Sequence, residues 1–257
     1  PPPTMGDGLD AEGQQAAMDK IADANHPLSE LLRKSIVAPF VLNIRSIKTP
    51  AGQSPARGVD AWFIAYGDWD TISSKEFLDG LAKRREQRSA DGQLTKSGLL
   101  EEAALAKRKI EARAKEGQDE RYFHATLSLF DKVEISGTRY ALLTRKPDSF
   151  LTAATIDPRF NDDEEYPNYW RSMVRDLENP QKVTFGPRHV YTSAGFYGKV
   201  TKLAKPAGAI FLEYHLVFEE PQGWFKGANL LRSKLPLLMQ EEVRNFRRKL
   251  VNASRGK

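Results

Sequence analysis

The chain has 257 residues, of which 40% are hydrophobic and 28% are charged, and this balance is typical of a globular protein with a full core. Lys and Arg number 39 against 34 Asp and Glu, a net charge of +5 that favours a mixed, solvated basic surface. No specific nucleic-acid site is predicted from it. No run of about 20 apolar residues is present, so no membrane-spanning helix is expected.

Cysteine is absent, which excludes disulfides, thiolate nucleophiles and cysteine-based metal sites. This absence suits an oxidising compartment, although many cytosolic proteins also lack cysteine. The chain starts with Pro1-Pro2-Pro3-Thr4, which indicates either a removed signal peptide or a trimmed sequence. We therefore expect an exported, soluble protein of the periplasm or cell envelope, with the cytoplasm left open.

The first part of the chain predicts an arm and then two strands. Residues 1–34 are polar and weakly helical, typical of a partly ordered N-terminal arm ahead of a single domain over 35–257. Strands are expected over 35–48 and 59–66, joined by a loop rich in Pro and Gly. Both faces of the second strand are apolar, so we expect it to be covered on both sides.

A segment dense in charge follows, over residues 73–120, and predicts a helical insertion. Its main helix is expected over 99–115, where a narrow apolar stripe recurs at helical spacing. Glu residues come early and Lys and Arg residues late in this stretch, the order that a helix dipole favours. The narrow stripe indicates a helix that is largely in contact with solvent.

The middle of the chain predicts a meander of three strands, over 122–135, 139–144 and 150–156. The acidic run 162–165 lacks the alternating ligands and the glycine of a calcium-binding loop, so a solvated loop is the better interpretation. An aromatic-rich stretch follows it, and a short helical piece is expected to end at Leu177.

The last third predicts three strands and a long helix. The strands are expected over 183–191, 196–203 and 209–220. The last strand alternates strictly, with an apolar face and a polar face. After Ser233 apolar residues recur every three or four positions, which predicts one face of a helix: Leu235, Leu238, Met239, Val243, Phe246 and Leu250. The fold class is therefore α+β, a curved antiparallel sheet packed on a long C-terminal helix with an additional charged helical segment.

No standard catalytic or nucleotide-binding motif is present, so no catalytic residue, metal or cofactor is predicted. Glu213 and His215 share the polar face of the last strand, and with His124 they could form a metal site or an acid–base pair. Polar residues on the solvated face of an antiparallel sheet are the better interpretation.

Glu242 is placed differently, at the edge of the apolar stripe of the last helix. A carboxylate in that position must be paired, protonated or exposed to water. A salt bridge at the boundary of the core explains it, and Lys249 lies on the same edge. The alternative is a polar group directed into a ligand cavity between helix and sheet.

The order of elements over residues 122–250 resembles the START-like, helix-grip superfamily. In that superfamily a curved antiparallel sheet wraps around one long C-terminal helix, and many members bind lipids in an apolar cavity between them. The resemblance covers element order and pattern, with no motif that could transfer a functional residue. Two features depart from it: the long charged stretch 83–120 and Pro236 early in the last helix.

The resemblance implies non-enzymatic binding or carrying of a hydrophobic small molecule or lipid between the sheet and the last helix. The residues expected to line such a pocket come from the last strand, the last helix and the second strand: Leu212, Tyr214, Leu216, Met239, Glu242, Phe246, Trp62 and Tyr66.

Two alternatives remain at this stage. One is a structural or interaction protein of the cell envelope with a filled core, and the other is an enzyme that uses Glu213, His215 or Glu242. For partners, the last helix carries basic residues opposite its apolar stripe, and these predict contact with an anionic membrane surface: Arg244, Arg248 and Arg255.

Overall fold

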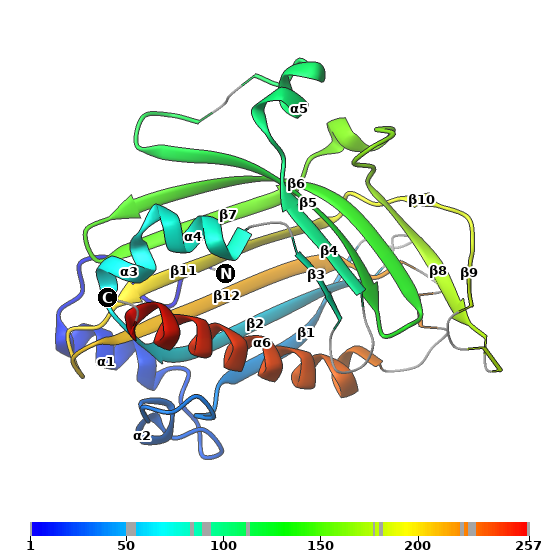
Figure 1. The fold of residues 1–257 in the computed structure, drawn as a ribbon. Helices are drawn as coiled ribbons and strands as arrows, with labels where there is room; N and C mark the ends of the chain where they lie inside the picture. Colours follow the sequence, from blue (N-terminus) through cyan, green and yellow to red (C-terminus); the bar gives the residue numbers. More distant parts are fainter. Residues whose placement is uncertain are drawn as a thin grey trace.

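Alternating apolar and polar residues build most of this chain into one curved antiparallel sheet, with a long helix along one face (Figure 1). The structure is a computed structural model. It describes residues 2–49, 55–82, 85–88, 94–111, 114–176, 178–179, 182–221, 224–225 and 230–255. Of residues 82, 85–88, 94–96 and 255 it describes the backbone alone.

In the described part of the chain, twelve strands pair in antiparallel fashion. Their bounds are β1 (Val41–Ile47), β2 (Ala56–Tyr66), β3 (Arg85–Arg88), β4 (Leu94–Leu99), β5 (Gln118–Leu129), β6 (Val133–Lys146), β7 (Ser149–Ile156), β8 (Tyr169–Arg175), β9 (Val183–Phe185), β10 (His189–Val190), β11 (Ala194–Lys202) and β12 (Ala209–Glu219). The order across the sheet is β1-β2-β12-β11-β7-β6-β5-β4-β3, while β8 pairs with β6, β9 and β10.

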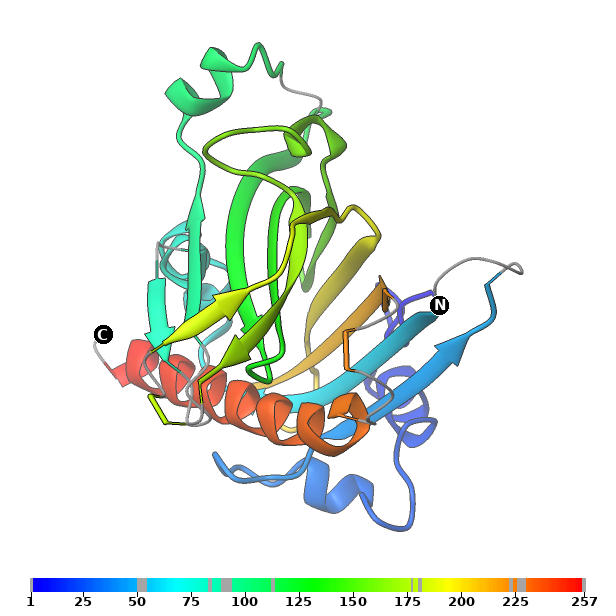
Figure 2. The same ribbon diagram turned by 90° about the vertical axis from the view of Figure 1, so that its right-hand side faces the viewer.

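The helices are α1 (Ala11–Asp19), α2 (Leu28–Leu31), α3 (Trp69–Ser73), α4 (Lys75–Ala82), α5 (Glu102–Lys107) and α6 (Leu230–Arg255), with a short 3-10 turn at Pro158–Phe160. Figures 1 and 2 show the strong curvature of the sheet, with α6 along its inner face and α1 and α2 outside it. The predicted fold class, an α+β protein with an antiparallel sheet and a long C-terminal helix, is confirmed.

Strand β2 and strand β12 lie side by side and contribute to both faces of the sheet. On the inner face, Ala65 and Leu212 pack with Leu250 of α6. On the outer face, Ile64 and Phe211 pack with the N-terminal segment, including α1 and α2. The prediction that the second strand is covered on both sides is confirmed, since its burial pattern shows buried or half-buried residues throughout.

Helix α6 presents its predicted apolar stripe to the sheet, with Val243 and Leu250 buried. It packs tightly against Gly67, just after β2, where an added Cβ would lie 2.5 Å from Leu250 Cγ. The helix begins at Leu230, earlier than expected, so Pro236 lies inside it beyond the first turn. No helix in the described part of the chain is both long and apolar enough to cross a bilayer.

The predicted strand 122–135 is wrong in one respect, because it is two strands joined by a tight hairpin. The turn residues Phe130 and Asp131 both have positive φ, 54° and 55°, as a type I′ turn requires. Gly or Asn usually occupies such a turn, and neither is present here, so the sequence did not predict it. The residues expected to turn next, 136–138, continue inside β6, and the helical piece expected before Leu177 is strand β8.

The predicted helix 99–115 is also wrong. Leu99 ends strand β4, and α5 contains only six residues, none of them buried. Lys109, with φ 53°, follows shortly after the end of α5. In Figure 1, α5 stands away from the sheet at the top of the view. The rest of the segment contributes α4, β3 and β4, while residues 83–84, 89–93 and 112–113 lie outside the described residues. Most of the predicted loop rich in Pro and Gly, residues 50–54, also lies outside them.

Residues 1–34 were expected to be a partly ordered arm, and the described part packs over the outer face of β12 and β2. Met5 and Met18 are buried against Phe211, and Leu31 joins the same cluster. The polar face of β12 is therefore covered by this segment. The division into an arm and a single domain over 35–257 stays a prediction.

Candidate functional site

A cavity of about 610 Å³ lies between the inner face of the sheet and α6. Strands β2, β4, β5, β6, β7, β11 and β12 contribute to its lining, as do helices α4 and α6. Its apolar lining includes Phe63, Leu78, Phe123, Leu143, Phe150, Phe196, Val200, Leu212, Met239, Val243 and Phe246. The volume falls within the range of roughly 300–1,000 Å³ that is usual for small-molecule sites.

Small residues on neighbouring strands explain why this space is open. Ala141 of β6 pairs with Ala154 of β7, and Gly198 of β11 pairs with Tyr214 of β12. All three small residues line the cavity. A Cβ added at Gly198 would meet nothing closer than 3.7 Å, which is ordinary van der Waals contact. The small side chains at these positions leave space above the strands.

Five of the eight predicted pocket residues line the cavity: Leu212, Tyr214, Met239, Glu242 and Phe246. Leu216 faces the same side but packs in a neighbouring cluster with Phe218 and Trp224, towards the start of α6. This cluster also contains Leu235 and Leu238. The role of these residues in binding a ligand stays a prediction.

Trp62 and Tyr66 do not line the cavity, because alternation along β2 directs Phe63 inwards and its neighbours outwards. Trp62 Nε1 donates to Thr4 Oγ1 at 2.9 Å, and the Tyr66 hydroxyl donates to the carbonyl of Leu32. Both aromatic side chains therefore hold the N-terminal segment on the outer face.

Arg139 is the cavity residue that sequence reasoning missed. Its guanidinium Cζ lies 4.9 Å from the ring centre of Phe123 and 5.6 Å from that of Phe196. It makes no hydrogen bond or ion pair with any described residue. Burial lowers the pKa of Arg139, and the nearby phenol of Tyr214 opposes this shift. The signal was present in the alternation of β6, which places Arg139 on one face with Ala141 and Leu143.

Tyr214 is the second polar group at this end of the cavity. Its ring centre lies 5.4 Å from that of Phe196, the same ring that flanks Arg139. Burial raises the pKa of Tyr214, while the positive charge of Arg139 opposes the shift. The phenol therefore keeps its proton at neutral pH and can donate a hydrogen bond.

The other charged residues that line the cavity are engaged or lie at its edge. Arg121 pairs with Asp79 at 2.7 Å. Lys199 and Glu213 line it through their backbone, since their side chains bind the N-terminal segment on the outer face. Glu242 is exposed on α6.

Glu213 and His215 lie in a buried cluster under the N-terminal segment, so their predicted place on a solvated face is wrong. Glu213 accepts hydrogen bonds from the backbone N–H groups of Thr4 and Met5, at 2.6 and 3.2 Å. His215 lies 2.8 Å from Asp60 and 3.2 Å from Glu213. Burial lowers the pKa of His215, but the two carboxylates more than offset this, so the pKa is raised.

The enzyme alternative named the side chains of Glu213, His215 and Glu242. Glu242 lies on α6, on the other side of the sheet from the side chains of Glu213 and His215, so the three do not form one site. His124 is far along the sheet from them, on β5, where it contacts Thr138. Within the described residues, no group of three or more His, Asp or Glu side chains could hold a metal ion.

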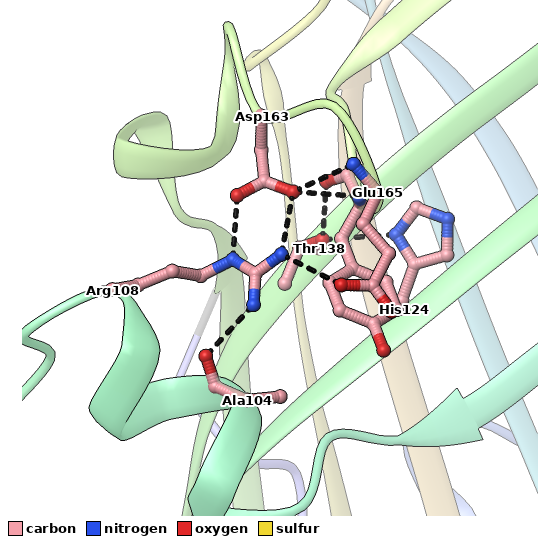
Figure 3. Close-up of polar contacts among 7 residues, drawn as sticks. Ala104, Arg108, His124, Thr138, Asp163 and Glu165 are labelled. Atoms are coloured by element: carbon pink, nitrogen blue, oxygen red, sulfur yellow. Dashed lines mark hydrogen bonds and ion pairs between the residues drawn. The ribbon is translucent and has the colours of Figure 1, made fainter.

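In the acidic run 162–165, Asp163 and Glu165 form ion pairs with Arg108, the residue directly after α5, as Figure 3 shows. Arg108 donates through Nε and Nη2 to Asp163, at 2.5 and 2.9 Å, and through Nη2 to Glu165 at 3.1 Å. The guanidinium also lies 4.8 Å from the ring centre of Tyr166. The hydrogen bond from Arg108 lowers the pKa of Asp163 to about 2. This loop thus connects the projecting helix to the sheet.

The basic face of α6 is only partly exposed. Arg244 is half-buried and Arg248 is exposed, while the side chain of Arg255 lies outside the described part of the chain. Arg247 is buried instead and donates to the carbonyls of Ile36, Ile64, Ala38 and Pro39. Contact of this helix with an anionic membrane stays a prediction.

No protein-family model matches this chain, and no curated protein matches it in sequence. Among solved structures, human STARD10 is similar with a TM-score of 0.35 and 9% sequence identity, over 94% of this chain and 84% of that one. A likeness at this level says nothing of function, so the cavity and its chemistry stand on the geometry above.

Proposed function

We propose that this protein binds a hydrophobic small molecule or lipid in the cavity between the sheet and α6, without chemical change to it. The observation that carries the proposal is the cavity, a largely apolar space of about 610 Å³ between the sheet and α6 that is partly open to solvent. Apolar clefts of this size are the usual form of small-molecule sites. A space of this size and lining is what a carried apolar ligand needs.

The lining also gives a reason for affinity. Each buried methylene contributes about 0.8 kcal/mol of transfer free energy, so a chain that fills the cavity would be bound by hydrophobic burial. A structural protein with a filled interface, the alternative considered from the sequence, would instead place large side chains at Ala141, Ala154 and Gly198.

Binding of a neutral apolar fluorophore, Nile red, tests the proposal. We expect saturable binding at one site per chain. Gly198→Leu should weaken it by about tenfold or more, because a leucine would take the space of several methylenes. Its Cβ meets only ordinary contacts, so the variant should fold.

Gly195→Leu is the matched control. Gly195 lies on the same strand, but alternation puts its side-chain position on the outer face, where a Cβ would meet nothing closer than 3.5 Å. This variant should bind as the wild type does. The absence of saturable binding, or an equal loss in the two variants, would contradict the proposal.

A further inference from the structure

We infer that the ligand of this cavity is an amphipathic acid, with an apolar body and one anionic head group held by Arg139 and Tyr214. The inference rests on the proposed function, since it names the class of ligand that the same cavity takes. Its basis is the geometry of the end of the cavity around Phe196, where both side chains meet.

The first step concerns the charge of Arg139. A guanidinium cannot lose its proton in a protein under ordinary conditions, so the side chain stays cationic. The faces of Phe123 and Phe196 offer it cation–π contacts, at 4.9 and 5.6 Å. Such contacts satisfy the charge in part but leave its five N–H donors without acceptors among the described residues.

The second step concerns water. While the cavity holds water, the guanidinium and the Tyr214 hydroxyl can be hydrated. A neutral apolar ligand that displaces this water would leave the guanidinium and the hydroxyl without hydrogen-bond partners. An unpaired buried charge is costly in free energy. An anionic head group removes that cost, because it accepts charge-assisted hydrogen bonds from the guanidinium and a further bond from the phenol.

The third step concerns the number of head groups. Among the cavity residues that the structure describes, Arg121 is paired with Asp79 and Lys199 with Asp7, at 2.7 Å each. Arg139 is the remaining cation, and the rings of Phe123 and Phe196 flank it. One acidic group on a hydrophobic chain or ring therefore matches the site, whether the group is a carboxylate or a phosphate.

Calorimetric titration with chain-matched probes tests the inference on the wild-type protein. The probes are dodecanoate, dodecyl phosphate, dodecanol and dodecyltrimethylammonium, each below its micelle concentration. We expect at least one of the two acids to bind about 10- to 100-fold more tightly than the alcohol, the ratio typical of hydrogen bonds to a charged group. The ammonium probe should bind most weakly. The difference between the two acids identifies the head group.

Variants locate the preference. Arg139→Met should bring acid binding down to the level of the alcohol, and Tyr214→Phe should reduce the preference in part. Arg139→Met should fold, since the half-buried Arg139 makes no hydrogen bond or ion pair with a described residue that the change would break. Arg145→Met is the matched control: it lies on the same strand, pairs with Asp119 at 3.6 Å and should keep the preference.

The outcomes separate the two proposals. Equal affinity for acid and alcohol in the wild type overturns the acidic-ligand inference and leaves apolar binding standing. A preference that survives in Arg139→Met overturns the role of this residue. No binding of any probe, together with no binding of Nile red, overturns both proposals. The wild-type comparison decides the ligand class even if a variant does not fold.

Discussion

His124 is a half-buried histidine whose ring nitrogens face hydroxyl groups. Nδ1 lies 2.9 Å from Thr138 Oγ1, as Figure 3 shows. Nε2 lies 3.3 Å from Ser136 Oγ, and the ring centre of Tyr166 is 5.4 Å from that of His124. Burial, together with the positive charge of Arg139, lowers the pKa of His124 from 6.5 to about 4, and Asp163 opposes this shift. The folded protein therefore holds this ring neutral at a pH where the unfolded chain protonates it.

This shift predicts a loss of stability in acid. A folded-state pKa below the unfolded value gives stability that is complete above pH 6.5 and is lost as the pH falls towards 4. The contribution changes by up to about 1.4 kcal/mol per pH unit in that window. Urea unfolding of the wild type and His124→Gln between pH 7 and pH 4 measures it. Carboxylates titrate there too, so the difference between the two proteins is the relevant quantity, and parallel pH profiles would contradict the prediction.

At the scale of elements, the sequence was informative where a strand or helix has one regular face. Strand β12 and helix α6 were predicted with their faces, because alternation and helical spacing are local properties. The hairpin turn at Phe130 and Asp131 was not, since a bulky residue such as Phe130 rarely adopts positive φ and no glycine follows Asp131. The predicted helix 99–115 failed because charge order and spacing favour a helix, whereas Leu99 is paired with Phe123 in the sheet.

The site was less predictable than the fold, for a physical reason. Leu212, Met239 and Phe246 follow from the apolar faces of β12 and α6. The cavity floor depends on Ala141, Ala154 and Gly198 meeting across three strands, which no local pattern encodes. The covering of Glu213 and His215 depends on residues 4–7, which carry no amphipathic pattern. Packing between residues far apart in the sequence determines both the cavity floor and the covering of these two side chains.

Helix α5 provides a prediction for hydrogen exchange. It has no buried residue, and in the described structure its link to the rest of the protein runs through Arg108 and its ion pairs with Asp163 and Glu165. Its amides should therefore exchange through local opening, at a free energy far below that of β12. Exchange measured by mass spectrometry on peptides from 102–107 and 209–219 tests this. Equal protection of the two peptides would mean that α5 belongs to the stable core.

At the scale of the whole molecule, the sheet separates two environments. Leu212 and Glu213 are neighbours in β12, yet one lines the cavity and the side chain of the other binds the N-terminal segment. That outer face is held by a network of polar contacts as well as by apolar packing. Lys199 donates to the carbonyl of Met5 at 2.6 Å and pairs with Asp7, which also pairs with Lys146. These two lysines hold the pKa of Asp7 well below its usual range.

This separation predicts that stability and ligand binding can be changed independently. Met5 is fully buried against the outer face, so Met5→Ala should cost roughly 2–5 kcal/mol of unfolding free energy, the usual range for truncation of a buried Met. Its affinity for Nile red, measured below its melting temperature, should equal that of the wild type, because the cavity lies on the opposite face. Gly198→Leu should show the reverse pattern, with weakened binding and little change in melting temperature. If Met5→Ala weakened binding as much as Gly198→Leu does, the two faces would be coupled through the sheet, and the N-terminal segment would have to be counted as part of the binding site.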